Sequence, residues 1–105
     1  MITDENKSNN KKQAFYREII NRYLAKRQWF MDERARRIQE FPQILLDAQA
    51  EDEAASDPLM DNASEVKVAH ADGLTELDSE VSAATRAIEE AKEEFRNDFG
   101  KDWND

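Results

Sequence analysis

The chain has 105 residues, of which 39% are hydrophobic and 37% are charged, and its formal net charge is −9. This length suits one small domain. With only two glycines, two prolines and no cysteine, the composition excludes a many-stranded barrel, a disulfide framework and a cysteine nucleophile, and it favours long helices.

The polar N-terminus, residues 1–9, is expected to be a disordered tail in front of a single helical domain at 10–105. Asn10, followed by Gln13, is typical of a helix start, because the Asn side chain can accept a hydrogen bond from an unpaired amide. We therefore predict a first helix over about 11–55. Pro42 has no amide hydrogen and should kink this helix.

The apolar residues of the first helix follow three lines at seven-residue spacing. The first line contains Tyr16, Tyr23, Phe30 and Ile44 and is interrupted by Arg37; the second contains Leu24, Met31, Ile38 and Leu45; the third, between them, contains Ile20, Arg27, Arg34, Phe41 and Ala48. Arg27 and Arg34 therefore stand in the middle of an apolar face, where an unpaired charge is costly.

A turn is expected at about 56–62, where Ser56, Asp57 and Pro58 supply turn residues, and a second helix at about 63–99. Asn62 with Glu65 forms a capping pair, and Thr75 is an alternative start because Gly73 should weaken or bend the helix. Gly100 suits the left-handed residue that ends a helix.

The second helix contains an unbroken heptad strip, with apolar residues three and four positions apart in alternation. The strip consists of Leu74, Leu77, Val81, Ala84, Ile88, Ala91 and Phe95.

These patterns predict an all-α fold, a long antiparallel helical hairpin resembling a coiled coil, which assembles further into a helical bundle. A turn near 57–62 would place Arg27 beside Ala91 and Arg34 beside Ala84, given equal helical rise on both arms. The predicted packing seam consists of Ile20, Leu24, Arg27, Met31, Arg34, Ile38, Leu77, Val81, Ala84, Ile88, Ala91 and Phe95.

Charge is divided unevenly along the chain. Residues 1–39 contain ten basic and five acidic side chains, whereas residues 40–105 contain five basic and nineteen acidic ones. A basic half can pair with an acidic half of the same chain, of another copy or of a partner. The basic aromatic set that could bind a partner or a nucleic acid is Arg22, Lys26, Trp29, Arg36 and Arg37. The acidic set that could imitate a phosphate backbone is Glu89, Glu90, Glu93 and Glu94.

Signals for catalysis are weak. His70 is the only histidine, His70 with Asp72 gives too few ligands for a metal, and no phosphate-binding loop occurs. We therefore expect no catalytic residue, no metal and no cofactor.

The sequence favours a non-enzymatic helical protein–protein interaction module, such as an adaptor, an inhibitor or an assembly factor. The expected partner is a second copy, another protein or both. No apolar run is long enough to span a membrane and no secretory signal occurs, so a cytoplasmic location is expected. The alternative is a nucleic-acid-binding accessory protein that uses the basic helix, or an acidic mimic that inhibits a nucleic-acid-binding protein.

Overall fold

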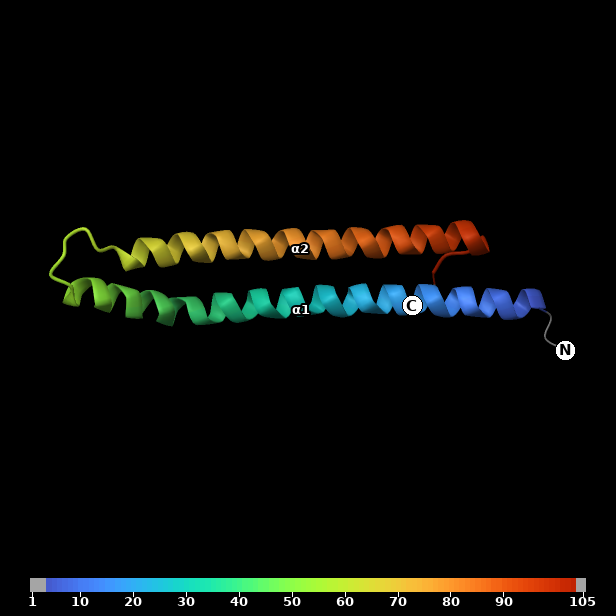
Figure 1. Ribbon diagram of the computed structural model, residues 1–105, viewed down its shortest axis with the longest axis horizontal. Coiled ribbons are helices and arrows are strands. Elements are labelled where there is room, and N and C mark those ends of the chain that lie inside the picture. The colour runs from blue at the N-terminus through green and yellow to red at the C-terminus, as the bar shows by residue number, and fades with distance from the viewer. Residues whose placement is uncertain (1–3, 104–105) are drawn as a thin grey trace. The chain divides into compact units, whose positions relative to one another are not determined.

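The fold of this computed structural model is all-α, as the sequence predicts. The structure describes residues 4–103, with side chains described from Asn9 onward. Helix α1 spans Asp4–Ala54 and helix α2 spans Asn62–Phe99, and no strand occurs between residues 4 and 103 (Figure 1).

The chain divides into two compact units. Unit 1 consists of residues 1–28 and 81–105, and unit 2 consists of residues 29–80. In each unit a segment of α1 packs against an antiparallel segment of α2. The contacts that show this are Tyr16 with Asp98 and Arg27 with Thr85 in unit 1, and Arg34 with Asp78 and Asp52 with Asn62 in unit 2.

The start of α1 differs from the prediction. The helix begins at Asp4 rather than near Asn10, so the expected disordered tail is wrong for residues 4–9, while residues 1–3 lie outside the described part. No glycine or proline precedes Pro42. Nothing in this segment therefore stops the helix from extending toward the N-terminus.

Pro42 does not break α1, which continues to Ala54. The proline leaves the carbonyl of Ile38 without its usual amide donor, which is one lost hydrogen bond in a helix of 51 residues. The predicted kink at Pro42 stays a prediction.

The start of α2 is capped by two aspartates. Asp61 accepts a hydrogen bond from the amide of Ser64 at 3.1 Å, so Asp61, and not Asn62, caps the helix. Asp52 of α1 accepts hydrogen bonds from the amides of Asn62 at 2.8 Å and Ala63 at 2.9 Å. With two carboxylates on its first amides, α2 begins at Asn62 and continues through Gly73, so a start at Thr75 is wrong.

The end of α2 agrees with the prediction. Gly100 has a φ of 67°, and its amide donates to the carbonyl of Arg96 at 2.7 Å. This is the left-handed C-terminal cap that glycine adopts without steric cost.

The predicted register is wrong. Arg27 donates to Thr85 at 3.4 Å in unit 1, and Arg34 is bound to Asp78 at 2.8 Å in unit 2, so each arginine contacts a residue six positions earlier than expected. The cause lies in the turn: Asp52 binds the first amides of α2, so the chain reverses at a lower residue number than the assumed midpoint.

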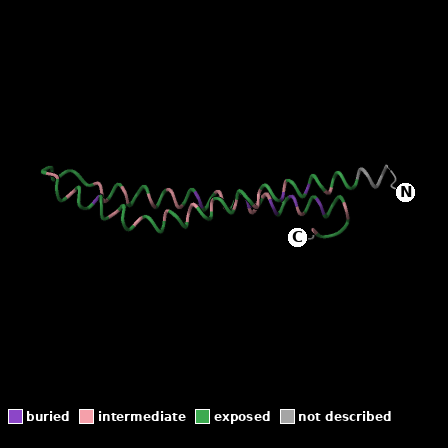
Figure 2. Tube along the Cα trace, turned by 90° about the horizontal axis from the view of Figure 1, so that it is seen from below, coloured by how far each residue is buried: buried purple, intermediate pink, exposed green. Residues whose placement is uncertain are grey.

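The apolar core is concentrated in unit 1. Six of the eight buried apolar residues among those described belong to this unit: Tyr16, Ile20, Ala84, Ile88, Ala91 and Phe95 (Figure 2). Ile20 is completely buried and packs with Ile88 and Ala91. Burying a side chain of this size contributes about 2 kcal/mol, so these few contacts supply much of the stability of unit 1.

Aromatic rings extend this core toward the end of α2. Tyr16 lies edge-on to Phe95 and Phe99, with ring centroids 5.6 and 6.1 Å apart, and Trp103 lies edge-on to Phe95 at 4.9 Å. The Tyr16 hydroxyl donates a hydrogen bond to Asp98. This bond, together with burial, raises the pKa of Tyr16 to about 12.

Candidate protein-interaction surface

The seam of unit 2 is polar. Among its described residues only Ala48 and Leu77 are buried and apolar. Arg34 is bound to Asp78, and Phe41 stacks on His70 with ring centroids 3.9 Å apart. Unit 2 therefore buries much less apolar surface than unit 1, although the two units contain similar numbers of large apolar side chains.

Those side chains lie on the surface. Nine large apolar residues are exposed among those described, and eight of them belong to unit 2. The eight are Trp29, Met31, Ile38, Ile44, Leu46, Leu59, Met60 and Val68; the ninth is Phe15 in unit 1. Exposed apolar side chains that gather in one part of a protein mark sites of association.

The predicted seam residues fall into three groups. The structure buries Ile20, Leu77, Ala84, Ile88, Ala91 and Phe95 and half-buries Leu24, Arg27, Arg34 and Val81. Met31 and Ile38 are exposed, at 47% and 44%, so their placement in the seam is wrong.

The error comes from the choice between two apolar lines on α1. On the first line Tyr16 is buried and Tyr23 and Phe30 are half-buried. On the second line Leu24 and Leu45 are half-buried, but Met31 and Ile38 are exposed. Arg37 interrupts the first line in the sequence. In the structure Arg37 is accommodated because Gly73 leaves space: a Cβ atom at Gly73 would lie 2.7 Å from the Arg37 Nη1 atom.

A stripe of α1 in unit 2 is both exposed and free of charged residues. Apart from the neighbours Ile38 and Gln39, successive members are three or four positions apart, so they lie on one side of the helix, between a quarter and a third of a turn from the seam. This uncharged face consists of Met31, Ala35, Ile38, Gln39, Pro42, Leu46 and Gln49. Asp32 and Glu53 border it near its two ends.

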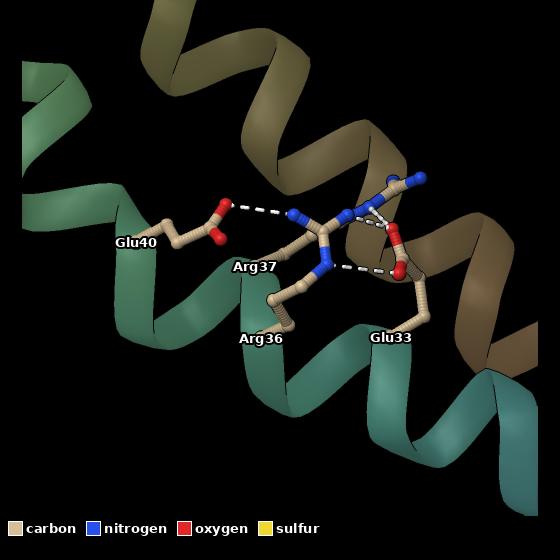
Figure 3. A network of polar contacts seen from close by, with 4 residues as sticks. All are labelled: Glu33, Arg36, Arg37 and Glu40. Atoms are coloured by element: carbon tan, nitrogen blue, oxygen red, sulfur yellow. Dashed lines mark hydrogen bonds and ion pairs between the residues drawn. The ribbon is translucent and has the colours of Figure 1, made fainter.

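A network of four charged residues lies on the other side of α1 from this face: Glu33, Arg36, Arg37 and Glu40. Arg36 is bound by both oxygens of Glu33, with its Nε atom 3.1 Å from Glu33 Oε2, and its Nη1 atom is 2.8 Å from Glu40 Oε2 (Figure 3). Arg37 Nε lies 3.2 Å from Glu33 Oε1. The pKa of Glu33 is lowered chiefly by the hydrogen bond that Arg36 donates to it. The pKa of Arg36 is raised by its hydrogen bonds to Glu33 and Glu40.

The structure does not bring the predicted basic set together in one place. Arg22 and Lys26 belong to unit 1, where Arg22 is paired with Glu18 at 3.0 Å. Trp29, Arg36 and Arg37 belong to unit 2, where both arginines are paired with glutamates and Trp29 is 61% exposed. The charge that these arginines could offer to a phosphate is partly neutralised by their own helix.

The predicted acidic set is exposed on α2 in unit 1. All four residues are accessible to solvent: Glu89, Glu90, Glu93 and Glu94. Glu89 also lines a groove of about 450 Å³ together with Arg27 and Lys92. Opposite charges therefore meet in this groove, and its wall is not purely acidic.

Metal-binding groups and membrane-spanning helices are considered for the described residues only. No group of three His, Asp or Glu side chains in this part of the chain is arranged to hold a metal ion. None of the helices described here combines the length and the hydropathy needed to cross a membrane. Comparison with protein-family models, with curated proteins and with solved structures finds no match to the chain.

Proposed function

We propose that the chain is a non-enzymatic, helical protein–protein interaction module, acting as an adaptor, an inhibitor or an assembly factor, whose docking surface is the uncharged face of α1. The observation that supports this proposal is the exposure of eight large apolar side chains in unit 2, where only two apolar residues are buried; three of the eight, Met31, Ile38 and Leu46, lie on this face. A cytosolic location is part of the proposal and rests on the sequence.

The energetics of unit 2 favour a protein as the ligand. Met31, Ile38 and Leu46 are between 44% and 58% exposed, and covering them removes apolar surface from water at a gain of about 25 cal/mol for each Å². A helix face of this kind can pack against another helix. The side chains of the two helices then interdigitate, with the helix axes about 8–10 Å apart. The nucleic-acid alternative is less well supported, because Arg36 and Arg37 are paired with Glu33 and Glu40.

A site-specific photo-crosslinker tests the proposal in the cell of origin. Placed at Ile38, which is on the uncharged face, the crosslinker should yield a discrete protein adduct. Placed at Glu40, two residues further on and on the opposite side of α1, it should yield none. Absence of a protein adduct from Ile38, or equal adducts from both positions, would overturn the assignment of this face as the docking surface.

A further inference from the structure

The charge of unit 2 limits what can cover the uncharged face. Unit 2 contains four basic and fourteen acidic side chains, a net charge of −10. Two copies of such a unit repel each other over most of their surface. They can approach only where acidic side chains are absent, and the uncharged face is such a region on α1.

The absence of charge also argues against a partner chosen by electrostatic attraction. A basic partner would be guided by carboxylates on the docking surface itself. Here the carboxylates of Glu33, Glu40 and Asp47 lie on the other side of α1, and the first two bind Arg36. The face offers apolar and amide side chains, which are as suitable for a copy of themselves as for any other neutral surface.

The chain exposes more surface than a compact protein of its mass. Its accessible area is 8096 Å², whereas a folded monomer of 12.2 kDa exposes about 6,000 Å². This excess of about 2,000 Å² is spread over the whole chain, and a stable interface of standard size buries roughly 800 Å² on each partner. Association with a second copy is one way to cover part of the excess.

We propose that two copies of the chain pair their uncharged faces antiparallel, about a two-fold axis at the middle of the face between Ile38 and Pro42. This inference rests on the proposed function and names the partner of the same surface. The position of the axis follows from the two ends of the face, because the faces overlap fully when Met31 of one copy lies opposite Gln49 of the other. Ile38 faces Pro42 of the other copy, and small Ala35 faces the larger Leu46, so the sizes are complementary.

Mass in solution tests the partner. Wild-type chain at micromolar concentration should have twice the mass of one chain by sedimentation equilibrium. Ile38→Glu places two unpaired carboxylates near the axis and should raise the dissociation constant at least about tenfold, with helicity unchanged because Ile38 is exposed. The matched control, Ser79→Glu, adds the same charge to the exposed side of α2 in unit 2 and should leave the dimer intact.

Single cysteines test the antiparallel geometry without background, because the chain has no cysteine. A short bis-maleimide should crosslink Ile38→Cys, which lies beside its copy. Met31→Cys should not react with its copy, since the two lie about 27 Å apart in the antiparallel pair. Glu40→Cys, on the other side of α1, should not react either.

Each contrary result has a definite meaning. A monomeric wild-type chain, a dimer that survives Ile38→Glu, or equal crosslinking through Met31→Cys would overturn the proposed pair. The proposed function would survive a monomeric wild type if the photo-crosslinker at Ile38 still captures a different protein. It would fall if that crosslinker captures nothing.

Discussion

The hydrogen bond between Tyr16 and Asp98 is a partly buried polar contact of unit 1. Tyr16 is 8% exposed and its ring packs against Phe95 and Phe99. Tyr16→Phe keeps the ring and removes only the hydroxyl donor. Because Asp98 is accessible to water and can be hydrated after the change, we expect a loss of about 1 kcal/mol in the free energy of unfolding. Urea denaturation at pH 7 measures it.

The same bond predicts a dependence on alkaline pH. The folded state raises the pKa of Tyr16 from 10 to about 12, so the folded chain holds the phenol proton more tightly than the unfolded chain does. The resulting stabilisation is complete below pH 10 and is lost as the pH rises toward 12. The difference in stability between wild type and Tyr16→Phe should therefore shrink over this range.

Gly73 is a second position where one residue decides the packing. An added Cβ would lie 2.7 Å from Arg37 Nη1, which is the far end of a flexible side chain and can move. Alanine is favoured over glycine inside a helix by roughly 1 kcal/mol, and the Arg37 side chain is still 42% exposed, so a small shift of its guanidinium costs little. Gly73→Ala should therefore stabilise the chain by about 0.5 kcal/mol in urea. A loss above about 1 kcal/mol would show that Arg37 has no alternative position.

At the scale of the elements, the turn between α1 and α2 depends on Asp52. Its carboxylate binds the amides of Asn62 and Ala63, two donors that have no partner within α2. Asp52→Ala should cost about 1 kcal/mol and speed amide hydrogen exchange at Asn62 and Ala63. Glu53→Ala removes the same charge from the same turn of α1 and should leave both amides protected. Equal exchange in the two variants would contradict the capping role.

The sequence predicts the elements better than it predicts their contacts. The heptad strip of α2 is unambiguous, because Leu77, Ala84, Ile88, Ala91 and Phe95 have no competing apolar line, and all five are buried. On α1 two lines compete, and periodicity alone does not choose between them. The structure chooses the line of Tyr16, Tyr23 and Phe30, which leaves Met31 and Ile38 on the surface.

Other differences between the predicted and the observed contacts involve residues that are far apart in the chain. Asp52 caps α2 across ten residues, and Gly73 makes space for Arg37, and neither relation has a local sequence signal. These long-range contacts set the register, so the assumed midpoint of the turn gave the wrong partners for Arg27 and Arg34. The uncharged face does have a sequence signal, namely uncharged residues at helical spacing in a chain that is 37% charged. Two of its residues, Met31 and Ile38, also fit the heptad spacing of a seam, so the sequence alone does not separate the two interpretations.

At the scale of the whole molecule, the two units differ in both packing and charge. Unit 1 contains eleven basic and ten acidic side chains and six of the eight buried apolar residues. Unit 2 has a net charge of −10 and buries only Ala48 and Leu77. Self-repulsion and a small core both lower the stability of unit 2. We therefore expect Ile88→Asp, which buries a carboxylate beside Ile20, to unfold unit 1 and with it most of the helicity measured by circular dichroism.

Amide hydrogen exchange connects this asymmetry with the proposed pair of copies. In dilute solution, amides at 29–54 should exchange faster than those at 9–28, because local opening is easiest where few apolar contacts hold the backbone. If a second copy covers the uncharged face, raising the protein concentration should slow exchange at 29–54 by mass action. In Ile38→Glu, exchange at 29–54 should stay fast at every concentration while exchange at 9–28 stays slow. Uniform protection of both segments in dilute wild-type chain would show that unit 2 needs no partner to be stable.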